Sequence, residues 1–406
     1  MVPSETELFA DLAEQQAPEA PGRGMPRLRQ PERHQLGWQV ATIDDLVARD
    51  HPVRAVWAFV QGLDLHALHD AVKAREGVPG QAPPAPELMM ALWLWATVDG
   101  VGSARQLARL CEQHLAYRWL CGGVSMNYHS LSDFRVAHAA VLDRLLAGGV
   151  AALVAQGVVA LDVRAQDGLR VRAAAGAGSL RRRERWSSWR RPPRGSSSCA
   201  ANSTPSREDN KAEVSRQKEP RASTTDAAAR AMKLADGGFR PAYNMQTISA
   251  PRGQVIVAVD IDTTGSDRGL ARPAPERLDA AARRPSDYLV DGGFTKNDDI
   301  EWAHASGIRL WCPPVHGKHR TDPYAPRPDD QPGVADWRQR MASEPGKALY
   351  KQRATAECPN AWARPMGLSR LLVRGKDKAR AVLLWFALAH DMRAFALRRR
   401  AMPAAT

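Results

Sequence analysis

Cysteine, aromatic residues and long apolar runs are all sparse in this chain of 406 residues. The five cysteines are scattered and form no Cys-x-x-Cys pair, which argues against a disulfide scaffold and against a zinc finger. The longest apolar stretches, near 88–98 and 381–389, are too short to span a bilayer and favour buried helices. The N-terminal residues are acidic and polar, so we expect no signal peptide. A cytoplasmic protein without a membrane partner fits these absences best.

Negative charge is also in short supply. The chain has 57 lysines and arginines against 44 acidic residues, which gives a formal net charge of +13. The arginines are spread along the chain and are not confined to a tail. A basic balance of this kind suggests an anionic partner, most often nucleic acid. The alternative interpretation is a generally basic soluble protein with no such partner.

The pattern along the chain predicts three parts and a short tail. Residues 1–33 are rich in Pro, Gly, Glu and Arg with little periodicity, which indicates a flexible arm. Residues 34–154 show the apolar spacing of several short helices, and arginines such as Arg135 suit a DNA-binding domain there. Residues 155–397 alternate strands and helices, which predicts an α+β or α/β core, and 398–406 form the tail.

Within the core, turn residues and apolar periodicity place the individual elements. Two strands, 243–249 and 254–261, are predicted to form a hairpin around the turn at 251–253. A loop-rich insertion is expected over 313–345. The other predicted strands are 158–163, 169–172, 287–290 and 308–312, and the other predicted helices are 276–283, 296–305, the stretch from 348 and 376–397.

A second insertion or linker is predicted over 185–235. Its first part, 185–208, combines Arg, Trp, Ser and Pro in an order that matches no structural period. One interpretation is a disordered basic linker. The other is a segment translated out of frame, since a GC-rich gene read in the wrong frame yields this composition.

Three acidic residues are notable for their context. Asp167 precedes a glycine between two β-like runs, Asp291 directly follows a predicted strand, and Glu357 lies in a predicted helix. Carboxylates at strand ends and on a facing helix suit Mg²⁺ (or Mn²⁺), because hard divalent cations prefer oxygen ligands. Two such ions can stabilise the attacking and leaving oxygens of an in-line phosphoryl displacement.

Other acids compete with this set. A single Asp-Gly is more often only a turn. Asp162 could replace Asp167 as a ligand. Asp236 repeats the Asp-Gly-Gly-Phe sequence of Asp291 but precedes a strand, which favours a turn. The segment His316–His319 is most simply an exposed loop that could contact a DNA backbone.

The spacing of Tyr350, Arg353 and Glu357 resembles the Y-(2)-R-(3)-E signature of insertion-sequence DDE transposases. Arg364 stands where that signature continues with lysine, a change that keeps the charge but alters the donor geometry. The resemblance extends over 34–397 through further ordered blocks, which are 127–135, 166–173, 243–246 and 288–294.

This resemblance implies an RNase H-like core after a helical N-terminal domain. It implies that Asp167, Asp291 and Glu357 are the catalytic residues and hold two Mg²⁺ or Mn²⁺ ions. It implies hydrolytic nicking at element ends, followed by attack of the 3′-OH on target DNA. The partners would be terminal inverted repeats and target DNA, bound by a homodimer associated with the nucleoid.

Helical geometry adds candidate DNA-binding residues. Offsets of −4 and +7 place Arg353 and Arg364 on the helical face of Glu357, where guanidinium groups can hold phosphates. Together with Tyr350 and Arg135, they are the predicted DNA-binding set. Two alternatives stay open at this point. One is a relative that binds DNA without catalysis, and the other is an RNase H-like nuclease that needs no helical N-terminal module.

Overall fold

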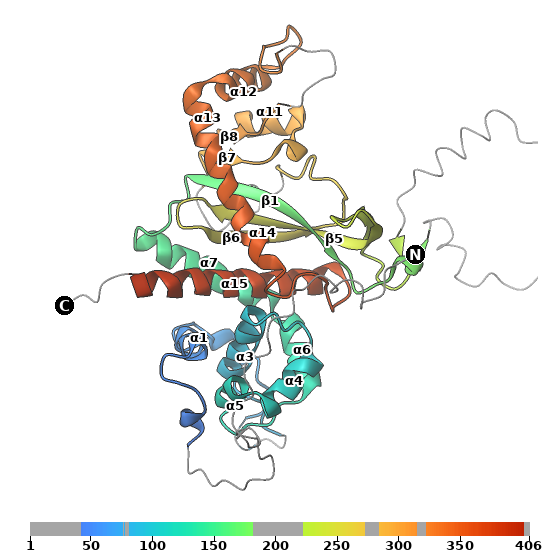
Figure 1. Cartoon of the computed structure of the whole chain (residues 1–406). Helices are drawn as coiled ribbons and strands as arrows, with labels where there is room; N and C mark the ends of the chain where they lie inside the picture. Colours follow the sequence, from blue (N-terminus) through green and yellow to red (C-terminus); the bar gives the residue numbers. More distant parts are fainter. Residues whose placement is uncertain are drawn as a thin grey trace, which may run out of the picture. The chain divides into compact units, whose positions relative to one another are not determined.

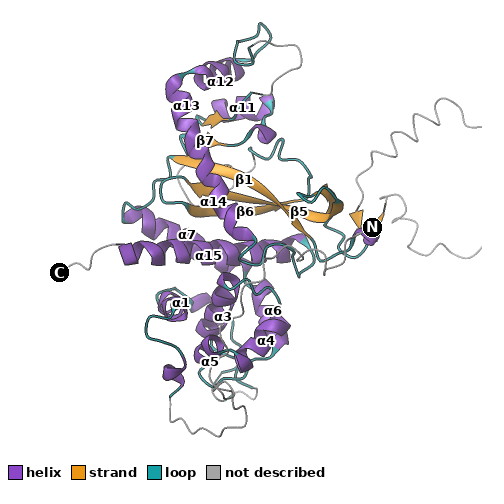
Figure 2. Ribbon diagram, viewed as in Figure 1, coloured by secondary structure: helices purple, strands orange, loops and turns teal. Residues whose placement is uncertain are grey.

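The computed structural model describes residues 42–75, 77, 81–181, 222–272, 284–314 and 322–401. These residues form a series of helices and a mixed β-sheet (Figure 1 and Figure 2). Several predicted segments lie outside the described residues, namely the arm at 1–33, the irregular stretch 185–208, the helix at 276–283 and the loop at His316–His319.

The described residues from Thr42 to Ala155 are mostly helical, and several of these helices begin where a side chain caps a free backbone N–H group. The Ser103 hydroxyl accepts a hydrogen bond from the backbone N–H of Gln106 at 3.3 Å. The Asn127 side chain accepts one from the N–H of His129 at 2.9 Å. The elements of this region are η1 (Ile43–Leu46), α1 (Pro52–Gln61), α2 (His66–Asp70), α3 (Pro86–Val98), α4 (Ala104–Gln113), α5 (Leu115–Cys121), α6 (Tyr128–Ala137) and α7 (Ala139–Ala155).

A mixed sheet follows, with strand order β2-β3-β4-β5-β1-β7-β8, and β6 also pairs with β5. β5 runs antiparallel to both β6 and β1, whereas β7 pairs with β1, and β8 with β7, in parallel. The predicted hairpin is confirmed as β5 and β6. The strands are β1 (Val163–Arg172), β2 (Leu180–Arg181), β3 (Ala222–Ser223), β4 (Arg230–Lys233), β5 (Phe239–Ala250), β6 (Val255–Asp262), β7 (Asp287–Leu289) and β8 (Arg309–Trp311).

This mixed sheet after a helical region confirms the expected α+β fold class. The predicted insertions contain more regular structure than expected. The described part of 185–235 carries β3 and β4, and the described part of 313–345 carries a helix, α12. β3 and β4 extend the sheet beyond β5, away from β1.

The predicted strand over 158–163 is wrong, because the chain reaches β1 only at Val163. Gly157 takes the left-handed conformation, with φ 69°, just beyond the end of α7. The N–H groups of Val158 and Val159 then bond back to the Leu153 carbonyl, as in a helix C-cap. The apolar run therefore forms the C-terminal cap of α7 instead of a β-strand.

The predicted helix around Glu357 is broken into shorter turns. α13 (Glu344–Tyr350) passes into the 3-10 helix η4 (Lys351–Ala356), and α14 (Glu357–Ala363) begins anew. Pro359 lies in the first turn of α14, where its missing N–H costs nothing. The remaining helical elements are η2 (Ala177–Ser179), η3 (Gly292–Phe294), α11 (Asn297–Ala305), α12 (Pro332–Ala342) and α15 (Lys376–Ala401).

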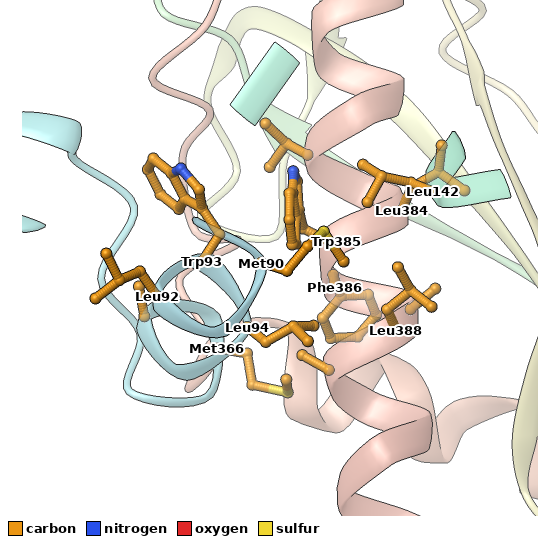
Figure 3. Packing of buried hydrophobic residues seen from close by; sticks show 14 of the residues in the cluster. Met90, Leu92, Trp93, Leu94, Leu142, Met366, Leu384, Trp385, Phe386 and Leu388 are labelled. Carbon is orange, nitrogen blue, oxygen red and sulfur yellow. The ribbon is translucent and has the colours of Figure 1, made fainter. Parts of the chain in front are cut away.

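α15 joins the two halves of the chain. It packs beside α7 along β6 and also contacts α3 and α6 (Figure 1). Figure 3 shows its side chains, among them Trp385 and Phe386, packed with Met90 and Leu94 of α3. The Trp385 indole N–H donates to the Arg135 carbonyl at 2.9 Å. The helical region and the sheet therefore share one hydrophobic core, although the sequence predicted a border near 154.

In the part of the chain that the structure describes, no single helix is long and apolar enough to cross a bilayer. α6 and α7 meet that length and composition only as a pair, and the pair is bent by 62°.

Candidate active site

Two parallel strands bring the first two predicted acids to one edge of the sheet. β1 and β7 pair in the register Ala165 with Leu289, so Asp167 and Asp291 each follow two residues later. The Asp167 side chain is 14% exposed and that of Asp291 is 38% exposed. Asp291 also caps η3, because its carboxylate accepts the N–H of Gly293 at 2.6 Å. Parallel pairing thus places both carboxylates at the same sheet edge.

Arg353 gathers the third acid with the first two. Its Nη1 donates to the Glu357 carboxylate at 2.7 Å. Its Nη2 donates to Asp167 at 3.2 Å and lies 3.7 Å from a carboxylate oxygen of Asp291. One guanidinium group therefore pairs with carboxylates from β1, from the end of β7 and from the start of α14.

Asn360 is a site residue that sequence reasoning missed. Its side-chain N–H donates to the second carboxylate oxygen of Asp167 at 2.7 Å. Asn360 lies three residues after Glu357, so a helix presents both side chains to the same side. That spacing was the only available signal, and an asparagine three residues after an acid is common in any helix. The amide fixes the orientation of the Asp167 carboxylate.

The electrostatics of the site follow from burial. Burial raises the pKa of Asp167 above its ordinary value, although the neighbouring Arg353 charge acts in the opposite direction. Burial also raises the pKa of Tyr350 to about 12, so its hydroxyl stays protonated. That hydroxyl donates to the Val290 carbonyl at 3.1 Å, which ties the end of α13 to the chain just before Asp291.

Two segments of the chain match models of known protein families. Residues 41–137 match a model described as "Transposase domain (DUF772)", and residues 206–392 match one described as "Transposase DDE domain". The two matches together span well over half of the chain. The chain belongs to the DDE transposases. No curated protein and no solved structure matches it significantly.

The match to the DDE domain places two of the three carboxylates of this transposase inside a family model. Asp291 and Glu357 lie within residues 206–392. Asp167 lies between the two matched segments, so only the geometry of β1 and its contact with Arg353 connect it to the set. DDE transposases are nucleases that act on DNA and generally use divalent metal ions.

The residues fit a divalent cation by ligand type and charge. Three carboxylates surround a single positive group, Arg353, whose side chain is only 15% exposed and whose buried Nε has no partner. Among the described residues, no three acidic, His or Cys side chains are close enough to share one ion. The guanidinium group lies between the carboxylates, where a cation would have to bind.

Other predicted residues lie apart from this cluster. Arg364 follows the last residue of α14 and is exposed, and its side chain has no hydrogen bond or ion pair within the described ranges. Arg135 lies in α6, where it donates to the Gly102 carbonyl. Its side chain makes no described contact with the three carboxylates. The DNA-binding roles of both arginines therefore stay predictions.

The competing acids are placed elsewhere in the fold. Asp162 is exposed and precedes β1, and its carbonyl accepts the N–H of Asp287 at the opposite end of the β1–β7 pair. Asp236 lies in the turn between β4 and β5 and pairs with Arg172 and Arg240. The turn predicted for Asp236 is confirmed, and Asp167 is the better placed of the two possible first ligands.

Proposed function

We propose that this DDE transposase cuts DNA at element ends and joins the freed 3′ ends to target DNA, with Asp167, Asp291 and Glu357 holding two Mg²⁺ or Mn²⁺ ions. The observation that carries the proposal is the single guanidinium group of Arg353, which pairs with carboxylates from three separate elements. These three acids are far apart in the sequence, yet all three lie beside one cationic group. An acid that served only in a turn would not be gathered with the others in this way.

The chemistry consists of two phosphoryl transfers. In the first, water attacks the phosphorus, the P–O3′ bond breaks, and a 3′-OH and a 5′-phosphate result. In the second, that 3′-OH attacks a target phosphodiester, a new P–O3′ bond forms, and the target O3′ leaves. Bound divalent cations would activate the attacking oxygen and stabilise the leaving oxygen in both steps.

The residues of the chain position these groups. Asn360 holds the Asp167 carboxylate in one orientation, and Tyr350 fixes α13 to the strand end that carries Asp291. Arg353 has a free buried Nε and can turn its paired donors toward a phosphate oxygen next to the scissile bond. Its charge then stabilises the phosphoryl group during transfer.

The test is cleavage of a duplex that carries the terminal sequences flanking this gene, with Mg²⁺ or Mn²⁺. Asp167→Asn, Asp291→Asn and Glu357→Gln should each abolish cleavage and leave DNA binding nearly unchanged. Loss of one ligand removes several kcal/mol of transition-state stabilisation. Matched controls are Asp162→Asn and Asp236→Asn, which should cleave at the normal rate.

If Asp167→Asn cleaves normally and Asp162→Asn does not cleave, the first metal ligand is Asp162 and not Asp167. DNA binding without cleavage by the unaltered chain, with either metal, would favour a non-catalytic relative instead. We propose further that the protein acts as a homodimer on DNA of the nucleoid. Sedimentation of the complex with paired element ends measures the first part of that proposal.

A further inference from the structure

A cavity lies away from the three carboxylates, between the starts of α4 and α6. Its volume is about 360 Å³. It is lined by Gly102, Arg105, Tyr128, Arg135 and Leu372, among others. The lining therefore comes from α4, from α6 and from the chain that follows α14.

Arg135 is the buried group of this cavity. The residue is only 9% exposed, and its side chain has no acidic partner within the described residues. One terminal nitrogen donates to the Gly102 carbonyl, whereas the buried Nε has no partner. The guanidinium carbon lies 4.6 Å from the ring centre of Trp93. A buried cation without a counter-ion is costly, so a site of this kind favours an anionic ligand.

A second arginine and two helix starts strengthen that preference. Arg105 is exposed, and its guanidinium carbon lies 5.1 Å from the ring centre of Tyr128 at the cavity. α4 and α6 both begin among the lining residues, and the partial positive charge of helix N-termini favours anions, although Ser103 and Asn127 already cap one N–H group of each. Asp133 also lines the cavity and opposes an anion, but it is exposed and stands against two arginines.

We propose that this cavity binds a backbone phosphate of the DNA on which the transposase acts, with Arg135 and Arg105 as its cationic groups. The proposal rests on the proposed function. It assigns a DNA contact to the helical region, separate from the cleavage site.

Geometry connects this cavity to the cleavage site. The Leu371 N–H bonds to the Arg172 carbonyl at 2.8 Å, directly before the lining residues Leu372 and Val373. Arg172 ends β1, five residues after Asp167, which corresponds to about 16 Å of extended strand. A duplex offers a phosphate at about every 3.4 Å of each strand, so one DNA segment can contact both sites.

The competing interpretation is purely structural: Arg135 would hold the Gly102 loop and stack on Trp93 without a ligand. Arg135→Ala can fail to fold on either interpretation, so exposed lining residues carry the test. Arg105→Ala removes a cation, Ser132→Glu adds an anion, and Asp133→Asn removes the opposing acid. Arg252→Ala is the matched control, since Arg252 is an exposed arginine in the turn between β5 and β6.

The measurement is fluorescence anisotropy of the full chain with a labelled random duplex of about 40 base pairs, at salt concentrations from about 50 to about 200 mM. Arg105→Ala should weaken binding about 3- to 10-fold and reduce the slope of log Kd against log salt by about one. Ser132→Glu should weaken binding as well, and Asp133→Asn should tighten it. Arg252→Ala should bind as the unaltered chain does.

Unchanged binding of Arg105→Ala and Ser132→Glu, or an equal loss with Arg252→Ala, would overturn the proposal. The cleavage assay separates this outcome from failure of the proposed function. If the Asp167 variant loses cleavage while Arg105→Ala retains normal binding, the phosphate site is wrong and the cleavage mechanism stands.

Discussion

At the residue scale, Arg353 is the centre of the candidate active site. Its guanidinium group compensates three carboxylates at 2.7, 3.2 and 3.7 Å, and its side chain is 15% exposed. Without a cation at this point, three like charges on one sheet edge would repel one another. Arg353 therefore stabilises the observed arrangement of the three carboxylates.

Replacement of Arg353 by alanine should slow cleavage about 100-fold even at saturating DNA. The reason is that a misplaced phosphate loses rate as well as affinity. Arg353→Lys keeps the charge without the planar fork and should recover only part of that rate. Single-turnover kinetics at saturating DNA measure the effect. Arg364→Ala is the comparison, because an exposed arginine outside the carboxylate cluster should only weaken binding. A full rate for Arg353→Ala would contradict the positioning role.

Asn360→Ala should raise the Mg²⁺ concentration needed for half-maximal cleavage about 10- to 100-fold, as loss of a group that orients a metal ligand typically does. The variant removes the 2.7 Å hydrogen bond to Asp167 and leaves the carboxylates in place. Mg²⁺ titration of the cleavage rate, alongside thermal unfolding, distinguishes this from a folding defect. The exposed Gln352→Ala should show neither change. An unchanged Mg²⁺ requirement for Asn360→Ala would remove Asn360 from the site.

At the element scale, an ion pair between the buried Asp287 and the half-exposed Arg309 joins β7 and β8 at the end of β7 opposite to Asp291. The Asp287 carboxylate accepts two hydrogen bonds from Arg309 at 2.7 Å each and one from the Trp311 indole at 2.8 Å. Burial acts to raise the pKa of Asp287, but these hydrogen bonds outweigh it and hold the pKa below its ordinary value. This pairing fixes the relative positions of the two parallel strands.

Asp287→Asn should therefore lower the free energy of unfolding by about 2 kcal/mol at neutral pH. The substitution removes the bidentate pair of the buried Asp287 carboxylate with Arg309, whose own side chain is half exposed. A carboxylate with a depressed pKa stabilises the fold above its unfolded pKa, and that contribution disappears as pH falls below about 4. The difference between Asp287→Asn and the unaltered chain should thus shrink on acidification.

Urea unfolding at several pH values checks this expectation. The control is Asp298→Asn on α11, whose exposed pair with Lys296 should change stability by less than about 0.5 kcal/mol. A difference between Asp287→Asn and the unaltered chain that grows toward low pH would contradict the assigned direction of the pKa.

At the scale of the whole molecule, α15 couples the helical region to the sheet. Residues of this helix contact α3 and α6 of the helical region and also pack, beside α7, against β6 of the sheet. The sequence suggested that 34–154 could fold and bind DNA as a separate fragment. Because α15 completes the core of that region, we expect the fragment not to form a stable fold without residues 376–401.

Trp385→Ala should lower the free energy of unfolding by about 3–5 kcal/mol, because it removes a fully buried indole and its hydrogen bond to Arg135. Unfolding should remain a single transition, since helices and sheet share one core. Calorimetry together with circular dichroism measures both properties, with the exposed Lys378→Ala on α15 as the control. Two separate transitions in the unaltered chain would show that the two halves fold independently.

Two of the three acids of the candidate site could be predicted from local sequence patterns, whereas Asp167 lies within β1 and is placed by strand pairing. Asp291 follows a short apolar strand, and Glu357 follows Tyr350 and Arg353 at helical spacing. Asn360 could not be found in this way, because its role depends on a contact with Asp167, 193 residues away. Arg364 shows the converse, since its offset from Glu357 suits the helix α14 that joins them, yet its side chain is exposed and has no hydrogen bond or ion pair within the described ranges.

The sequence by itself determined the family, the class of fold, the β5–β6 hairpin and most of the helices, because apolar periodicity and turn residues act locally. Only the tertiary structure decided that 158–162 closes a helix and that α15 completes the helical core. It also decided that Arg353 bridges three carboxylates and that Arg135 lines a separate cavity. Each of these depends on contacts between residues far apart in the chain, which strand pairing and side-chain packing settle and local patterns do not encode.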